Sequence, residues 1–176
     1  MITIELKDAE LQAALSGLEA LLADLSPVMN EIGDFLVTAT KDRMAAGKTP
    51  EGSPFAPRSA ATLAIYARRK ITFGPTPLRQ SGEMGQQIAH SYGPDSVQVG
   101  SNAIQAAVMQ FGAAQGQFGA AIGRTRPSDI RPKSQDYFVP IPWGDIPARP
   151  FLGLSDEDRS GILDIVSEAL AAALQA

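Results

Sequence analysis

Few side chains in this 176-residue chain could carry catalysis. Its single histidine, His90, precedes Ser91, and a serine with a histidine is a familiar pairing of nucleophile and base. Both residues belong to a segment that predicts a β-strand, and neighbouring strand residues point to opposite faces of a sheet. The two side chains therefore cannot hydrogen-bond productively, and we interpret His90 as an ordinary strand residue.

Metal, carboxylate and phosphate chemistry find no better support. The chain has no cysteine and its acids are scattered over helix surfaces, so no cluster of metal ligands is expected. Three adjacent acids at 156–158 stand at the start of a predicted helix, where the helix dipole favours negative charge. The glycines at 112–119 lack the dinucleotide-binding spacing, and the Gly-Lys-Thr run at 47–49 lacks the upstream glycine of a phosphate loop. We predict no catalytic, cofactor or metal site and no enzyme activity.

Basic stretches could instead contact phosphates or the acids of a partner. Residues 68–70 read Arg-Arg-Lys at the end of a predicted helix, where cations suit the dipole. The stretch 113–135 carries Arg124, Arg126, Arg131 and Lys133. They could touch a nucleic-acid backbone in a salt-sensitive way, but no aromatic residue interleaves with them for base stacking. A protein neighbour is therefore the favoured partner, and a DNA backbone is the alternative.

Charge is distributed unevenly along the chain, although the net charge is only −4. Residues 1–39 carry seven acids and one lysine, whereas residues 40–80 carry eight basic residues and two acids. Residues 144–176 are again acidic, with six acids and two arginines. Such separation could direct head-to-tail self-association. The alternative is that the charges only solvate the helices on which they stand.

The N-terminal part predicts a short strand and two helices. Residues 2–6 alternate between apolar and polar types, which is typical of a half-buried strand. From about residue 9 the pattern becomes helical, and one face collects the leucines Leu11, Leu15, Leu18, Leu22 and Leu25. A second helix is predicted to begin at an N-cap, Ser26, followed by a proline, and to end at Gly47.

The middle of the chain predicts short elements separated by turns. The stretch 47–58 is too rich in proline and glycine for a regular element. Ser59 is a suitable cap for a helix over 60–70, and a shorter helix is expected around 78–86. Residues 87–101 predict a hairpin, because two alternating segments flank a Gly-Pro-Asp turn.

The remaining elements include the segment with the least periodicity. Asn102 is predicted to cap a helix that ends at Gly112. Residues 112–135 predict a long mobile loop, which compact domains seldom carry without a use for it. A strand follows over 136–141, and the last helix begins at Ser155 with an acid three residues later that completes a capping box.

These elements predict a single α+β domain over residues 1–176. A small antiparallel sheet would carry the N-terminal helices and the C-terminal helix, because the short strands are joined by turns and not by crossover helices. No apolar run is long enough to span a membrane, and the N-terminus lacks the features of a signal peptide. The absence of cysteine suits a protein made in a reducing cytoplasm.

Four segments taken together resemble one protein family. They are Gly47-x-x-Pro50-x-Gly52-x-Pro54-Phe55-x-Pro57, Leu78-x-x-Ser81-Gly82-x-Met84, Val97-x-Val99-Gly100-Ser101 with Ala106–Gly112, and Ile146-Pro147-Ala148-Arg149-Pro150-Phe151-Leu152-Gly153 with the closing helix. In this order they resemble the phage virion morphogenesis family, the tail-completion or neck proteins of Mu-like and P2-like phages.

The resemblance implies a structural protein that needs no catalytic residue. It implies assembly as a ring on the end of the tail, where the protein completes the tail or joins it to the filled head. The implied partners are further copies of the chain and the tail tube, terminator or head-connector proteins. The implied location is the tail or neck of the virion, assembled in the bacterial host cytoplasm. A nucleic-acid-associated assembly factor that contacts DNA through 113–135 is the alternative function.

Proline-rich loops hold an extended shape at low entropic cost, so they could present anchors to a neighbouring subunit. The residues that we expect to act in this way are Phe55, Arg58, Arg124, Arg126, Arg131, Trp143, Arg149 and Phe151. A second interpretation stays open, because large aromatic residues usually belong to the core. On that interpretation Trp143 and Phe151 pack inside their own subunit and Arg149 makes an internal pair.

Overall fold

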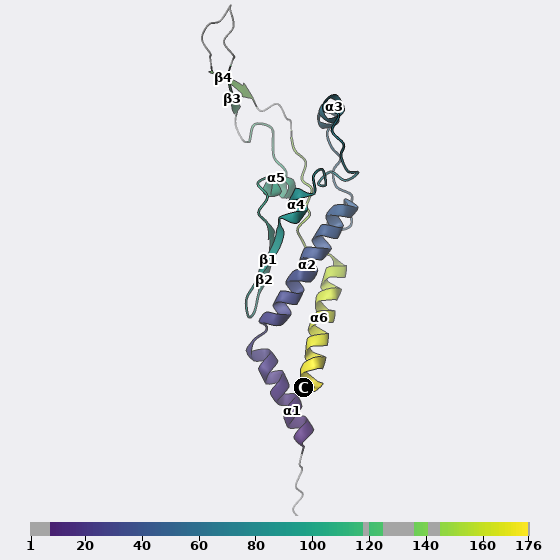
Figure 1. Cartoon of the computed structure of the whole chain (residues 1–176), viewed down its shortest axis with the longest axis vertical. Coiled ribbons are helices and arrows are strands. Elements are labelled where there is room, and N and C mark those ends of the chain that lie inside the picture. The colour runs from purple at the N-terminus through teal and green to yellow at the C-terminus, as the bar shows by residue number, and fades with distance from the viewer. Residues whose placement is uncertain (1–7, 118–119, 125–135, 141–144, 176) are drawn as a thin grey trace, which may run out of the picture.

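A computed structural model describes residues 8–117, 120–124, 136–140 and 145–175 (Figure 1). Three long helices form its frame: α1 (Ala9–Ala23), α2 (Ser26–Ala46) and α6 (Asp156–Gln175). Helices α1 and α2 follow one another along the long axis, and α6 runs antiparallel beside them (Figure 1). No helix in these described ranges is long and apolar enough to cross a membrane.

Two glycines let α6 approach its neighbours closely. A Cβ atom at Gly17 of α1 would clash with the carbonyl oxygen of Ala173. A Cβ atom at Gly161 of α6 would clash with the ring of Phe35 on α2. The contact of α6 with both N-terminal helices therefore depends on two positions that have no side chain.

A β-hairpin covers another side of α2. Strands β1 (Ile88–Tyr92) and β2 (Val97–Ser101) pair antiparallel, with His90 opposite Val99, and both strands contact α2. Residues of four elements form one core cluster here. Val28, Ile32 and Leu36 of α2 are at its centre, and the side chains packed against them include Leu21 of α1, Val97 and Val99 of β2, and Ile162, Ile165 and Val166 of α6. The predicted α+β fold, with helices packed on a small antiparallel sheet, is confirmed.

A second core lies at the other end of α2. The short helices α3 (Ala60–Arg69), α4 (Glu83–Gln86) and α5 (Ala106–Phe111) belong to this end of the molecule (Figure 1). The buried residues of this core are Met44, Phe55, Leu78, Met84, Ile88, Ala103, Ala106 and Phe151. Helix α3 contributes no buried residue. The loop segments thus supply much of this core, whereas α3 lies outside it.

The stretch 112–135 is not the continuous loop that we predicted. The backbone of β3 (Ala120–Arg124) pairs antiparallel with β4 (Asp136–Pro140) and forms a second hairpin. The small residues of β3 give no alternating pattern, so only the non-local pairing with β4 defines this strand. The strand expected from residue 136 is confirmed, whereas the strand expected at 2–6 lies outside the described residues.

Two predicted helix caps are confirmed. The Ser59 hydroxyl accepts a hydrogen bond from the backbone N–H of Thr62 at 3.2 Å. At the start of α6, the Ser155 N–H donates to the Asp158 carboxylate at 2.8 Å, and the Asp158 N–H donates to the Ser155 hydroxyl at 3.1 Å. This reciprocal pair is the predicted capping box.

Two other predicted caps are wrong. The N-cap of α2 is Leu25, and Ser26 is already helical, because its N–H is satisfied by the Asp24 carboxylate at 2.9 Å. Helix α5 begins at Ala106 and not directly after Asn102, whose N–H donates to Gln87 at the base of the first hairpin at 3.3 Å. In both places a hydrogen bond to another residue takes the place of the cap that the local sequence indicates.

Candidate functional site

The segment 146–153 folds back into its own subunit. The Arg149 side chain is buried and donates to the carbonyl oxygens of Ala56 and Pro57 at 2.7 Å each and of Pro147 at 3.4 Å. Burial, and to a smaller extent the positive charge of Arg58, lower the pKa of Arg149. Arg149 therefore ties two proline-rich segments together inside the subunit.

The two aromatic residues of these segments are core residues. Phe151 is fully buried, and Phe55 is 6% exposed. Gln110 of α5 fixes the backbone beside them, because its side-chain oxygen accepts from the N–H groups of Phe151 and Leu152 at 3.0 Å each. Its amide nitrogen donates to the Leu152 carbonyl at 2.9 Å. For Phe55, Arg149 and Phe151, the structure thus shows packing inside the subunit and no presented anchor.

Arg58 has an internal contact as well. Its guanidinium donates to the Thr76 carbonyl and lies 4.8 Å from the centre of the Phe73 ring. The Phe73 ring is 5.0 Å from the ring of Tyr66 on α3, whose hydroxyl donates to Gln80 at 2.6 Å. Arg58 therefore helps to hold α3 on the loop that follows it. Its side chain is half-buried.

The other predicted interface residues lie outside the described side chains. Arg124 belongs to β3, of which the backbone alone is described, and Arg126, Arg131 and Trp143 fall in undescribed segments. Their expected contact with a protein neighbour, and the alternative contact with a DNA backbone, stay predictions. The side chains that are described, those of Phe55, Arg58, Arg149 and Phe151, all have contacts inside the subunit.

One ion pair joins the ends of the two central helices. Arg43 near the end of α2 pairs with the Asp158 carboxylate of the capping box and also donates to the Gly153 carbonyl at 3.0 Å. The Asp158 side chain is only 4% exposed. This carboxylate therefore ends up with two roles, because it caps α6 and holds α6 against α2.

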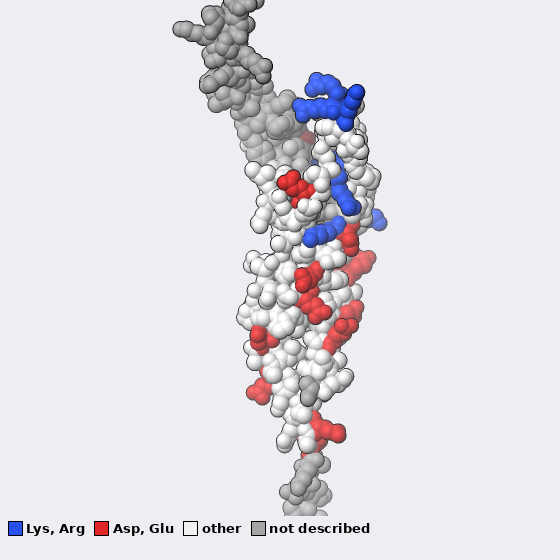
Figure 2. Space-filling view, viewed as in Figure 1, with Lys and Arg blue, Asp and Glu red and all other residues white. Residues whose placement is uncertain are grey.

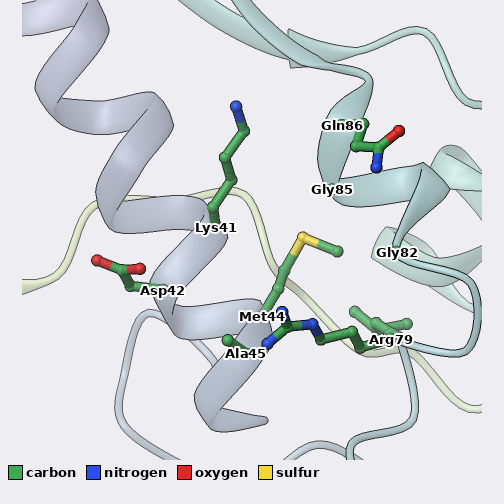
Figure 3. A pocket seen from close by; sticks show the side chains of 9 residues that line it. Lys41, Asp42, Met44, Ala45, Arg79, Gly82, Gly85 and Gln86 are labelled. Carbon is green, nitrogen blue, oxygen red and sulfur yellow. The ribbon is translucent and has the colours of Figure 1, made fainter. Parts of the chain in front are cut away.

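The residues that could carry catalysis are dispersed. His90 packs against α2, where its Nε2 lies 3.1 Å from the Asn30 side-chain oxygen, while Ser91 is exposed. A shallow pocket of about 340 Å³ opens between α2 and α4, and Lys41, Asp42 and Arg79 are its charged lining residues (Figure 3). Asp42 points away from the hollow, into which Met44 projects (Figure 3). Within the described ranges no cluster of acids and histidine could hold a metal ion.

Charge is separated over the surface of the molecule. Figure 2 shows basic side chains gathered around α3 and acidic ones along the helices towards α1. The basic group includes Arg68 and Arg69 in the last turn of α3 and the adjacent Lys70. On this face the basic side chains thus lie towards one end and the acidic ones towards the other, which agrees with the charge blocks of the sequence.

The comparison with known families agrees with these observations. A model of the phage virion morphogenesis family matches residues 6–171. The chain belongs to the phage virion morphogenesis family. No curated protein and no solved structure matches it significantly.

As a member of the virion morphogenesis family, the protein has a role in the assembly of phage particles. The family is a structural one, which suggests a function without catalysis. The match covers the internal contacts of Arg149, Phe151 and Gln110 and extends over α1, α2 and most of α6.

Sequence reasoning missed two residues that organise the fold. Gln110 and Arg43 make the contacts that fix the segments around residues 151–153, yet both stand among ordinary helix residues. Gln110 follows four apolar residues in α5 and precedes Phe111, so a polar residue in the middle of an apolar run was the available signal. For Arg43 no such signal exists, since a basic residue in the last turn of a helix is expected from the dipole alone.

Proposed function

We propose that this protein acts in tail completion or head–tail joining, as a ring of identical subunits at the end of the phage tail. Membership of the virion morphogenesis family supports a role in particle assembly. The observation that carries the finer proposal is the separation of charge, with a basic surface around α3 and an acidic one along the long helices (Figure 2). A subunit with two unlike ends can bind the next copy head to tail, which is the geometry that closes into a ring.

The internal contacts give such a subunit a fixed shape. Arg149 and Gln110 lock the loops between the helices, and the Arg43–Asp158 pair locks α6 to α2. A frame of this kind holds its surfaces in place before docking, so binding orders few additional groups and loses less entropy. Neighbouring proteins of the tail tube, the terminator or the head connector would then dock on a preformed ring.

A complementation experiment tests this function. Tails are prepared from a phage that lacks the gene, purified protein is added, and joining to filled heads is counted by electron microscopy and by plaque formation. We expect joining to be restored by the wild-type chain and not by a chain in which Phe151→Ala has disrupted the core. Failure of the folded wild-type protein to bind or complete such tails would refute the proposal.

A further inference from the structure

The leucine row of α1 does not face the rest of the subunit. Leu11, Leu15 and Leu22 are spaced by four and seven residues, so they share one side of the helix, and they are 52%, 56% and 66% exposed. The residues that face α6 are Gly17 and Leu21. Leu21 precedes Leu22 by one position, which turns the leucine row about 100° away from α6.

Helix α6 repeats this arrangement. Leu170 and Leu174 are 38% and 51% exposed. The residues directly before them, Ala169 and Ala173, make the contact with the neighbouring helices. The exposed leucines of α6 are thus turned away from α1 by about the same angle.

The antiparallel packing brings both rows to one side. Helices α1 and α6 run in opposite directions side by side (Figure 1). A rotation of one residue has opposite senses for two such helices, so by helix geometry the two rows point to the same side of the α1–α6 pair. We call this surface the leucine face; its members are Leu11, Leu15, Leu22, Leu170 and Leu174. Apolar patches rimmed by polar residues are typical of protein-binding sites.

The charges around the leucine face indicate what it binds. Helix α1 has no lysine or arginine, and its Glu19 is exposed beside the leucine row. Helix α6 has one basic residue, Arg159, against five acids, and its exposed Asp164 and Glu168 lie on the polar side next to its leucines. Two copies joined through identical leucine faces would oppose acid to acid, which disfavours a symmetric contact.

Helix α3 has the complementary chemistry. It buries none of its residues, and Leu63 and Ile65 are both 41% exposed. Its last turn and C-cap carry Arg68, Arg69 and Lys70, all exposed. Leu63 and Ile65 stand two positions apart and point to different sides of the helix, whereas Ile65 lies on the same side as Arg68 and Arg69, three and four positions later. This side of α3 combines an apolar and a basic character, which fits an apolar surface with an acidic rim.

We propose that the leucine face binds α3 of a second copy of this chain. The two surfaces lie at opposite ends of the subunit (Figure 1), so each bound copy leaves one α3 and one leucine face free for the next. Such a contact propagates and yields a closed ring or an open filament according to its angle. The inference rests on the proposed function only in that a ring needs a head-to-tail contact; the surfaces are assigned from exposure and charge.

Sedimentation velocity of the full chain over a range of concentrations and salt tests the contact. We expect reversible self-association that weakens with salt, because charged residues surround the apolar contact.

Leu15→Gln/Leu22→Gln and Arg68→Gln/Arg69→Gln should each reduce the association constant about tenfold or more. The matched controls Ala13→Gln/Ala20→Gln, on another side of α1, and Lys48→Gln/Arg79→Gln, two exposed basic residues outside α3, should associate like wild type. Circular dichroism verifies that each variant is folded.

A charge exchange identifies the partners. The variants Arg68→Glu/Arg69→Glu and Glu19→Lys/Glu168→Lys should each fail to self-associate, whereas an equimolar mixture should associate again, since every junction then pairs opposite charges. A wild-type chain that stays monomeric, or variants that associate like wild type, would overturn the proposed contact. If such variants still restore tail joining, the function stands without this contact; if wild type associates as proposed but does not complete tails, the function fails and the contact stands.

Discussion

Two regions of the molecule have roles opposite to those that their residue types indicate. The proline-rich segments 47–58 and 146–153 carry the aromatic and arginine residues of a binding arm, yet they are joined by buried hydrogen bonds in one subunit. The regular helices α1 and α6 carry leucine rows typical of a core, yet several of these leucines are exposed. Irregular segments thus stabilise the subunit, and regular helices present its apolar surface.

The difference shows that burial follows from the partners that a segment finds and not from its own regularity. The carbonyl groups of proline-rich segments have no strand or helix to satisfy them, so the Arg149 guanidinium takes this role. A helix satisfies its own backbone and can leave a whole side exposed without a hydrogen-bonding penalty. The core cluster that contains Phe55 and Phe151, which we call the loop core, can be compared with the leucine face by mutation.

The largest effect is expected at the centre of the loop core. Phe151→Ala should lower the free energy of unfolding by about 3–5 kcal/mol, because it opens a cavity around a fully buried ring. Urea unfolding measures the change. The exposed Phe111 provides the control, since Phe111→Ala should change stability by no more than about 0.5 kcal/mol. Equal effects of the two variants would contradict the assignment of Phe151 to the core.

Removal of the buried guanidinium should have the next largest effect. Arg149→Met should destabilise the fold by about 2–3 kcal/mol, because it leaves the carbonyls of Ala56 and Pro57 without a donor. Arg149→Lys should recover little of this loss, since an ammonium group does not reproduce the planar fork that spans the two carbonyls. The measurement is chemical denaturation, with Arg68→Met on the surface of α3 as the control. Full recovery by lysine would show that charge alone matters at this position.

The link between α2 and α6 should contribute a smaller amount. Asp158→Asn removes the ion pair with Arg43 and weakens the capping box, so we expect a loss of about 1–3 kcal/mol. Asp156→Asn in the same helical turn is the control, because Asp156 is exposed. Thermal unfolding compares the two variants. A loss of equal size in both would indicate that only the helix dipole, and not the pair with Arg43, is responsible.

The smallest effect on stability is expected at the leucine face. Leu15→Gln/Leu22→Gln should change the free energy of unfolding of the monomer by no more than about 0.5 kcal/mol for each residue, since both side chains are more than half exposed. Leu21→Gln, one position earlier, packs against the core between α2 and α6 and should cost clearly more. Denaturation at low protein concentration separates stability from self-association. A large loss in the double variant would place these leucines inside the subunit after all.

Local patterns predicted the helices and the first hairpin well. The alternation around the Gly-Pro-Asp turn predicted the hairpin of β1 and β2, and Ser59 and Ser155 marked two helix starts correctly. These features depend on neighbours within a few residues, which the sequence displays directly. Strand β3 was missed because its definition depends on pairing with a segment more than ten residues away.

The candidate site was less accessible from sequence. Phe55, Arg149 and Phe151 have the types that interfaces favour, but the same types also stabilise cores. The choice between the two depends on whether Ala56 and Pro57 meet residues 147–151 in space, across more than ninety positions of chain. The leucine periodicity of α1 was read correctly as one side of a helix, but only packing decides which side turns inward.

The absence of a side chain at Gly17 sets the distance between α1 and α6, and with it the spacing of the two leucine rows on the leucine face. Because a Cβ atom at Gly17 would clash with the Ala173 carbonyl oxygen, α1 and α6 meet there through backbone, and the bare glycine keeps the two leucine rows close together. A single added methyl group would act as a wedge between the helices and would spread the rows apart. The spacing of the leucine rows is thus set by Gly17, which faces α6 and lies outside the leucine face itself.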